Sequence, residues 1–382
     1  MAEMESIGEL CQLINGYAFK PSDWSSDGTP IVRIQNLNNI LAGFNYFKGK
    51  LAEKYYIDNG ALLFSWSGTP GTSFGAFIWN RGPAIINQHI FRVIPKKRIN
   101  IFYLKYAING KLSDIIAKSH GGVGLQHITK KDLEKITILI QSFDVQNKIV
   151  MTLNSLEDIL EKRKQQLSKL DQLVKSRFVE MFGDENSFHN WVTCKVDSIA
   201  EICVGIVIKP SQYYTLDIES GVKAFRSLNI REMYIKNKDW VYLTKAGHQK
   251  NQKSIVKEND VLIVRSGSPG TACVATKEYV GYNAIDIIIA HPNCKKINPV
   301  FLAMFTNMPH GMNQIRENTG GAAQQHFNVG GYKNITIILP PLPLQEQFAA
   351  FVQQVEKAKS SVNLSLEKLE TLKKSLMQEY LG

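Results

Sequence analysis

Two histidines, His127 and His326, are the side chains with the most evident capacity for acid–base chemistry in this sequence. Each follows a glutamine, and the two Gln-His pairs lie 199 residues apart. A general base needs a partner within hydrogen-bond reach, and neither histidine has one in its own stretch of sequence. We therefore interpret both as hydrogen-bonding loop residues rather than as catalytic bases.

Known catalytic motifs are absent from the sequence. It contains no GxxxxGK[ST] phosphate loop, no HExxH and no GxSxG elbow. The Asn-Pro-Pro-Tyr type of tetrapeptide, with which amino-methyltransferases hold a flipped adenine, is also missing, as is an Asp…Glu-x-Lys nuclease cluster. The five cysteines are scattered and form no CxxC or Cys/His metal spacing. These absences predict a non-catalytic chain with no metal site and no cofactor of its own.

The elements that position these residues occur twice. The offset that pairs the histidines also pairs the segments 62–71 with 261–270, 135–138 with 334–337, and 167–176 with 366–375. Nearer the N-terminus the offset falls to about 190, matching Gly16 with Gly205, which places insertions between the copies in loops. A period this long indicates a domain followed by a helix, used twice, rather than a solenoid.

Charge and composition narrow the functional class. The formal net charge is +11, of which residues 1–183 carry +7 and the remainder +4. A basic surface on each copy suits a polyanion such as nucleic acid, although charge that only confers solubility stays an alternative. No run of eighteen apolar residues and no signal-peptide pattern occurs, so we expect a cytoplasmic protein with reduced thiols and no membrane association.

Short β-rich runs separated by Gly, Pro and Asn predict a mixed α/β domain in each copy. In the first copy the predicted strands are 30–34, 61–66, 90–94 and 136–140, with helices near 101–108 and 112–118. The second copy repeats this order, with strands that include 261–264 and 285–289.

Each copy ends in a long helix, predicted at about 145–182 and 344–381. Apolar residues there alternate in steps of three and four, which is the spacing of a coiled-coil seam. Where one helix carries a charge on the seam, as at Arg163, the other is apolar, as at Val362. We infer that the two helices pair with each other in antiparallel fashion; amphipathic helices packed only on their own domains are the alternative. The residues predicted to carry this pairing and partner docking are Leu153, Leu156, Leu167, Leu170, Val355, Leu366, Leu369 and Leu376.

The predicted fold class is therefore α+β: two similar mixed α/β domains separated by two long helices that pair as an antiparallel coiled coil. The predicted boundaries are 1–143 for the first domain, 144–183 for its helix, 184–341 for the second domain and 342–382 for its helix.

The whole chain resembles the specificity subunit of type I restriction–modification enzymes. The strongest local matches are LPPLPLQEQ at 339–347, GGAAQQHFN at 320–328 and DVLIVRSG at 260–267. The first copy departs from this pattern, with QSFDVQ at 141–146 in place of the proline-rich lead into the helix. That departure affects the predicted start of the first helix, not its existence.

The resemblance implies that each domain is a target-recognition domain for one half of a split double-stranded DNA site. It implies that the helices set the gap and dock two modification subunits, which methylate adenine, and that the assembly can recruit two restriction subunits. S-adenosylmethionine, ATP and Mg²⁺ would then be bound by those partners and not by this chain.

Reading DNA requires side chains that contact phosphates and base edges. Asn and Gln can pair with adenine through two hydrogen bonds, and Arg can do so with guanine. Taken singly, each such residue is as consistent with a structural loop role. The predicted DNA-binding residues are Lys20, Arg33, Gln35, Asn36, Asn38, Ser67, Thr69, Gln126 and His127 in the first copy, and Lys209, Arg226, Ser227, Asn229, Arg265, Ser266, Ser268, Gln325 and His326 in the second.

Three other functions stay open at this point. A stand-alone DNA-modifying enzyme would turn over S-adenosylmethionine or need Mg²⁺ by itself, which the missing motifs disfavour. A coiled-coil scaffold would bind partners through the helices and have no affinity for DNA. An RNA-binding protein would be expected to show aromatic strands of the RNP type, and none is evident.

Overall fold

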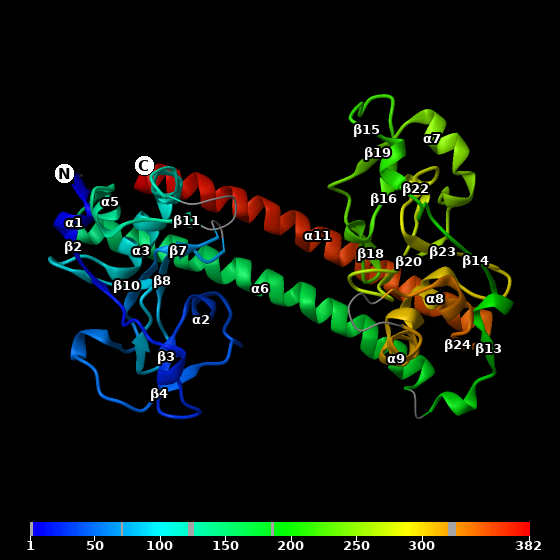
Figure 1. The fold of residues 1–382 in the computed structure, drawn as a ribbon, viewed down its shortest axis with the longest axis horizontal. Helices are drawn as coiled ribbons and strands as arrows, with labels where there is room; N and C mark the ends of the chain where they lie inside the picture. The colour runs from blue at the N-terminus through cyan, green and yellow to red at the C-terminus, as the bar shows by residue number, and fades with distance from the viewer. Residues whose placement is uncertain (1–2, 70–71, 121–125, 185–186, 320–325) are drawn as a thin grey trace. The chain divides into compact units, whose positions relative to one another are not determined.

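The computed structural model describes residues 3–69, 72–120, 126–184, 187–319 and 326–382 (Figure 1). The chain forms two compact units. Unit 1 combines residues 1–164 with 364–382, and unit 2 comprises residues 165–363. Each unit therefore contains one globular part and one half of each long helix. The domain boundaries drawn from the sequence stay a prediction.

Unit 1 is built on a four-stranded antiparallel sheet in the order β2 (Cys11–Asn15), β10 (Ile90–Pro95), β6 (Leu62–Ser65) and β8 (Gly75–Ile78). Alternate residues of β6 enter different cores: Leu62 and Phe64 pack in one, and Leu63 packs in the other. Burial on both faces explains why this strand reads as a continuous apolar run. The second sheet has the order β4 (Asn45–Phe47), β3 (Thr29–Val32), β9 (Ala84–Ile86) and β5 (Tyr56–Ile57).

The remaining strands and short helices of unit 1 complete its two cores. They are β1 (Glu3–Ser6) paired with β12 (Thr137–Ile140), β7 (Ser67–Gly68) paired with β11 (Gln126–His127), α1 (Ile7–Leu10), α2 (Ile34–Asn38), α3 (Ile101–Gly110), α4 (Leu112–Ala117) and α5 (Lys130–Glu134).

Unit 2 repeats the same topology. Its main sheet has the order β14 (Ala200–Val204), β23 (Ile287–Pro292), β20 (Val261–Val264) and β21 (Ala272–Val274). The second sheet has the order β15 (Tyr214–Thr215), β19 (Val241–Leu243), β16 (Val222–Phe225) and β22 (Asn283–Ala284). The other elements are β13 (Thr193–Lys195) paired with β24 (Thr336–Ile338), the hairpin β17 (Ile230–Arg231) and β18 (Tyr234–Ile235), α7 (Lys245–Lys250), α8 (Pro299–Asn307), α9 (Pro309–Glu317) and α10 (Val329–Lys333).

The repeat extends to single contacts. A Cβ atom at Gly16 would lie 2.1 Å from the Asn87 carbonyl oxygen, and one at Gly205 would lie 2.2 Å from that of Ala284. Both glycines therefore permit a close approach of two backbone segments. This explains why glycine stands at the matched position of both copies despite the change of offset.

A buried glutamine fixes the start of each long helix. Gln146 accepts a hydrogen bond from the Asn100 N–H at 2.9 Å and donates to the Gln141 carbonyl at 2.9 Å. Gln345 does the same with Asn298 at 2.8 Å and Pro340 at 2.7 Å. The proline-rich lead of the second copy and its different counterpart in the first are thus held by the same contact.

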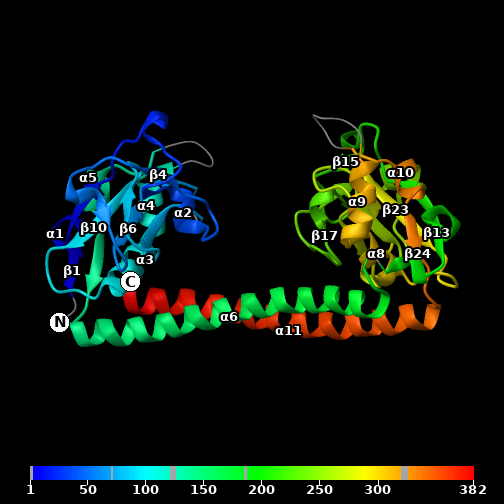
Figure 2. The same ribbon diagram turned by 90° about the horizontal axis from the view of Figure 1, so that it is seen from below.

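The long helices α6 (Phe143–Phe182) and α11 (Leu342–Leu381) run side by side in opposite directions (Figures 1 and 2). In unit 1, Lys373 of α11 binds Glu157 of α6 at 2.7 Å. In unit 2, Lys359 of α11 binds Asp171 of α6 at 2.8 Å. The predicted fold class, with two mixed α/β domains and an antiparallel helix pair, is confirmed.

Charged seam positions are matched by acids rather than only by apolar residues. Burial by itself lowers the pKa of Lys359, but hydrogen bonds to Asp171 and Glu356 outweigh this effect and raise that pKa above its usual value. The lysine therefore stays charged within the seam, where sequence alone suggested an apolar facing residue.

Candidate nucleic-acid interface

The predicted loop residues of unit 2 meet where the loop after β20 lies against the segment before α10. The Phe327 N–H donates to the Arg265 carbonyl at 3.0 Å, and Arg265 Nε donates to the Phe327 carbonyl at 3.1 Å. These bonds bring Ser266 to His326, whose Nδ1 lies 2.8 Å from the serine Oγ. The two residues are thus neighbours although 60 positions separate them in the chain.

A carboxylate holds this cluster together. Asp286 accepts from Arg265 Nη1 at 2.5 Å and from Ser266 Oγ at 3.1 Å. Its φ of +52° lies in the left-handed region, which is uncommon for a residue other than glycine. Asp286 was not predicted as a site residue, although it is the only charge in the apolar run 285–289 and that contrast could have identified it.

Unit 1 uses the same backbone junction with different side chains. The Ile128 N–H donates to the Trp66 carbonyl at 3.1 Å, at positions 199 residues before Phe327 and Arg265. Strand β11 then pairs Gln126 with Gly68 and His127 with Ser67. The repeated junction thus presents one serine and one histidine in each unit.

Aromatic rings replace the ion pair of unit 2. The Trp66 ring centroid lies 6.1 Å from that of His127 and 5.1 Å from that of His89. Burial, together with the nearby His127, holds the pKa of His89 below its usual value, which favours the neutral ring. The two junctions therefore offer different chemistry: rings and a neutral imidazole in unit 1, and a guanidinium bound to a carboxylate in unit 2.

Two of the predicted DNA-reading residues, Asn36 and Asn229, have structural roles instead. Both are buried, at 3% and 0% exposure. Asn36 Oδ1 accepts from the Arg33 N–H at 2.9 Å, and Asn229 Oδ1 accepts from the Arg226 N–H at 2.9 Å. Their amide groups also donate to carbonyls of the following loop. Since these side chains fold the loops from within, we do not include them in the proposed DNA-contacting set.

The other predicted residues divide by exposure. Arg33 donates to Asn45 Oδ1 at 2.9 Å and lies over the Trp24 ring, while Arg226 donates to the Asp239 carbonyl, so both guanidinium groups are partly engaged. Ser67 is buried, Arg265, Ser266, Ser227 and His127 are half-buried, and the exposed ones are Lys20, Gln35, Asn38, Thr69, Lys209, Ser268 and His326. For Gln126 only the backbone is described, and Gln325 lies outside the described residues.

The predicted helix-pairing residues all lie at least half-buried. Leu153, Leu156, Val355 and Leu366 are buried, and Leu167, Leu170, Leu369 and Leu376 are half-buried. Their packing is consistent with a role in pairing. Whether any of them also contacts a partner stays a prediction.

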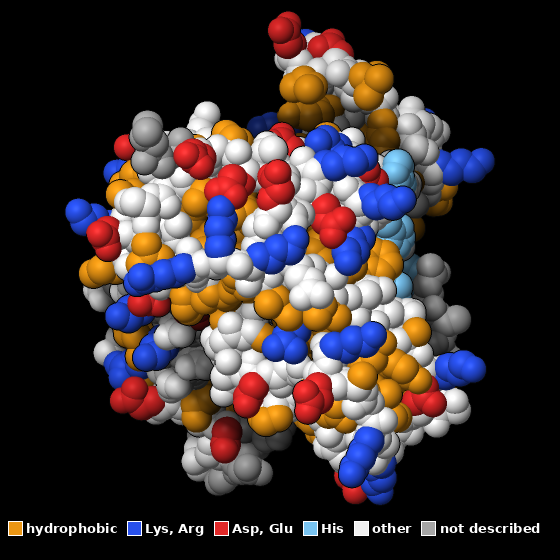
Figure 3. All heavy atoms as spheres, turned by 90° about the vertical axis from the view of Figure 1, so that its left-hand side faces the viewer, with side chains coloured by type: hydrophobic (Ala, Val, Ile, Leu, Met, Phe, Trp, Pro, Cys, Tyr) orange, Lys and Arg blue, Asp and Glu red, His pale blue; other side chains and the backbone are white. Residues whose placement is uncertain are grey.

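The described part of the chain holds no group of three or more His, Cys, Asp and Glu side chains suited to a metal ion. Over the same residues, no helix combines the length and apolar character that a membrane span requires. On the face drawn in Figure 3, Lys and Arg side chains are interspersed with acidic and apolar ones rather than gathered in one patch.

Comparison with known proteins completes this description. The family model described as "Type I restriction modification DNA specificity domain" matches the chain twice, at residues 2–170 and 189–371. The chain is 22% identical to the Escherichia coli type I restriction enzyme EcoBI specificity subunit, over 97% of this chain and 84% of that protein. It is 21% identical to the MjaVIII specificity subunit of Methanocaldococcus jannaschii, over 98% of this chain and 91% of that protein.

Two solved structures share the fold. The type I restriction–modification S subunit from M. genitalium aligns with a TM-score of 0.56 and 13% identity, over 100% of this chain and 96% of that one. A chain solved in work on complex assembly and conformational transition of the type I R-M system aligns with a TM-score of 0.57 and 14% identity, over 99% and 97%.

Proposed function

This chain belongs to the type I restriction–modification DNA specificity family, and we propose that it reads a bipartite DNA target, one half with each unit. Members of the family are non-catalytic subunits that recognise a DNA sequence. What the proposal adds is the division of labour between the two units.

The repeated loop junction is the observation that carries this proposal. The same backbone hydrogen bond, from Ile128 to Trp66 and from Phe327 to Arg265, joins the same two loops in both units. The side chains at the junction differ, because Trp66 stands where the second copy has Arg265. A shared scaffold with different side chains is what two unlike half-sites would require.

We assign the exposed lysines Lys20 and Lys209 to phosphate contacts, which position a domain without reading sequence. The exposed amides Gln35 and Asn38 are candidates for adenine edges in unit 1. In unit 2, Ser268 and His326 are candidates for base edges, while Arg265 would first have to exchange its bond to Asp286 for a guanine. That exchange would make readout by Arg265 conditional on the DNA.

The proposed partners are two modification subunits, docked along α6 and α11, and two restriction subunits recruited by the assembly. S-adenosylmethionine, ATP and Mg²⁺ would be held by those subunits, and the complex would act in the cytoplasm. The antiparallel pairing supports this arrangement, because it gives two partners pseudo-equivalent helical surfaces.

The test is methylation-aware sequencing of DNA from a host that carries the modification subunit with and without this chain. We expect a split adenine motif only when the chain is present. The double variant Gln35→Ala/Asn38→Ala should relax one half of the motif and leave the other unchanged, and Ser268→Ala/His326→Ala should do the reverse. A motif that both variants degrade uniformly, or a methylome that does not depend on the chain, would refute the division of labour.

A further inference from the structure

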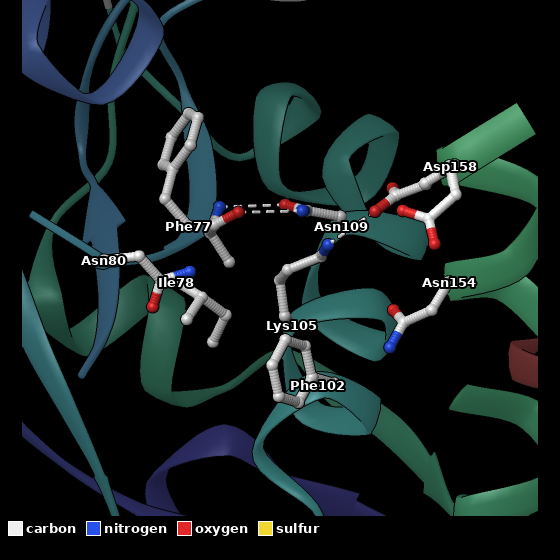
Figure 4. Close-up of a pocket in the computed structure, with 10 residues that line it drawn as sticks. Phe77, Ile78, Asn80, Phe102, Lys105, Asn109, Asn154 and Asp158 are labelled. Atoms are coloured by element: carbon white, nitrogen blue, oxygen red, sulfur yellow. Dashed lines mark hydrogen bonds and ion pairs between the residues drawn. The ribbon is translucent and has the colours of Figure 1, made fainter. Parts of the chain in front are cut away.

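A groove in unit 1 lies between the outer edge of β8, helix α3 and the first half of α6 (Figure 4). Its volume is about 580 Å³. In the figure, Phe102 and Lys105 from α3 and Asn154 and Asp158 from α6 face Ile78 of β8 across the space. The lining residues are Ala76, Phe77, Ile78, Asn80, Phe102, Lys105, Asn109, Asn154, Glu157 and Asp158.

Unit 2 fills the equivalent position with its own hairpin. The β17–β18 turn lies against the edge of β21, where the Met233 N–H donates to the Ala272 carbonyl at 2.9 Å. Asn307 Nδ2 lies 3.5 Å from the Met233 Sδ, so the methionine side chain is held beside α8. Only about 190 Å³ remains there, next to the turn.

The two edges are otherwise built alike. Asn109 in unit 1 and Asn307 in unit 2 each bond both the N–H and the C=O of the edge residue, Ala76 or Ala272, at 2.8 to 3.0 Å. The Ala272 carbonyl also accepts the Met233 N–H, whereas the Ala76 carbonyl has no second donor among the described residues. Unit 1 therefore presents the acceptor that the hairpin occupies in unit 2.

A shorter loop explains the difference. The loop anchored by Asn229 extends nine residues to the Lys238 carbonyl and contains the hairpin. The matching loop anchored by Asn36 extends seven residues to the Gly43 carbonyl and forms no strand against β8. Unit 1 thus lacks the segment that covers the groove in unit 2.

The hairpin also indicates the charge of an occupant. Glu232, beside Met233 in the turn, binds Lys175 of α6 at 2.7 Å. The repeat places Lys374 of α11 at the position of Lys175, and Lys374 is exposed. Its neighbour Lys373 binds Glu157, a lining residue of the groove. An occupant with an acidic residue next to an unbranched apolar one would therefore meet a matching cation.

We propose that this groove binds a β-hairpin turn of a partner polypeptide, which pairs with the edge of β8 and places an acidic and an apolar residue as Glu232 and Met233 do in unit 2. Strand addition of this kind supplies backbone hydrogen bonds, and the pocket supplies selectivity. The inference rests on the proposed function in one respect: the partner to be tested is the modification subunit. The two docking events would then be unequal, because only unit 1 has an open groove.

The experiment uses the full chain and its modification subunit, with hydrogen–deuterium exchange and calorimetric titration. Residues of β8 alternate in pairing with β6, so Ile78 directs its N–H to the outer edge. We expect exchange at Ile78 to slow at least tenfold in the complex, while Val274 of β21 does not change. Lys374→Glu should weaken the tighter binding step about tenfold through like-charge contact. The matched control is Lys368→Glu, which makes the same charge change on α11 and should bind as the unsubstituted chain does.

Each outcome decides the inference. If Ile78 exchange is unchanged and the two lysine variants bind alike, the groove is not the docking site, although the chain can still direct methylation. If protection of Ile78 arises in the chain alone and grows with its concentration, a second copy is the occupant and the proposal is wrong. If the unsubstituted chain neither binds the modification subunit nor alters the methylome, the proposed function fails as well. Equal melting temperatures of the two variants would show that neither effect reflects unfolding.

Discussion

Stability of unit 2 should fall as the pH rises from 7 to 9.5, because His291 is bonded to a buried carboxylate. Its Nδ1 lies 2.5 Å from Asp260 Oδ1, and its Nε2 lies 3.6 Å from the Cys203 Sγ. Asp260 is only 2% exposed. The hydrogen bond to Asp260, followed by that to Cys203, raises the pKa of His291 from 6.5 to about 9.

The sign follows from proton linkage. A histidine whose pKa is higher in the folded than in the unfolded state stabilises the fold most below the unfolded value. This contribution is lost as the pH rises through the folded value, here between pH 6.5 and about 9. At roughly 1.4 kcal/mol per pKa unit, the full contribution is about 3 kcal/mol, of which about 2 kcal/mol should disappear between pH 7 and pH 9.5.

Two buried thiols allow the units to be measured separately. Cys273 is 0% exposed in unit 2, and Cys11 is 1% exposed in unit 1. Thiol labelling in dilute urea, resolved by peptide mass and corrected for the labelling rate of unfolded chain, gives the opening free energy at each site. Protection of Cys273 should fall by about 2 kcal/mol over this pH range, while protection of Cys11 should change little.

The variant His291→Gln is the control, because it cannot titrate. Its Cys273 protection should be lower at pH 7 and nearly independent of pH. In the unsubstituted chain, protection of Cys273 that stays constant to pH 9.5 would refute the assignment. A decrease of the same size in His291→Gln would refute it too, since another group would then be responsible.

Three further substitutions test how the helices are held. Gln345→Ala should destabilise unit 2 by about 2 to 4 kcal/mol, because it leaves the Asn298 N–H and the Pro340 C=O without a partner; Gln347→Ala, at an exposed position, should cost less than about 0.5 kcal/mol in urea unfolding. Leu153→Ala, at a fully buried seam position, should destabilise unit 1 by about 3 kcal/mol, against less than about 0.5 kcal/mol for Leu173→Ala, where the side chain is 47% exposed. Asn229→Asp should expose Cys273 to labelling without changing Cys11, because the buried carboxylate cannot donate to the Lys238 carbonyl as the amide does.

Much of the architecture could be predicted because it depends on local pattern. The 3–4 spacing of apolar residues predicts helices that pair, and the runs at 61–66 and 90–94 predict strands that the structure contains as β6 and β10. The offset of 199 residues predicts that Ser266 and His326 play matching roles to Ser67 and His127, and the same backbone junction brings each pair together.

Other features depend on contacts that no local pattern contains. Asn36 and Asn229 have the residue type of adenine readers, but the loops that follow them turn back and enclose their amides. Asp286 joins the site only because β23 begins beside the loop after β20. Likewise, nothing in the sequence of the β17–β18 turn shows that it covers the edge of β21, since that depends on a difference of two residues in loop length.

The division of the chain into units has a consequence for its synthesis. Unit 2 is continuous from residue 165 to 363, whereas unit 1 needs residues 364–382 to complete its core. Among these last residues, Leu381 is 2% exposed and packs in the same core as Leu153. At translation rates of about 5 to 20 residues per second, residues 1–164 would wait roughly 10 to 40 s for that segment. Unit 2, although made second, would thus be the first able to fold completely on the ribosome, and the unit that starts the chain would be the last to close.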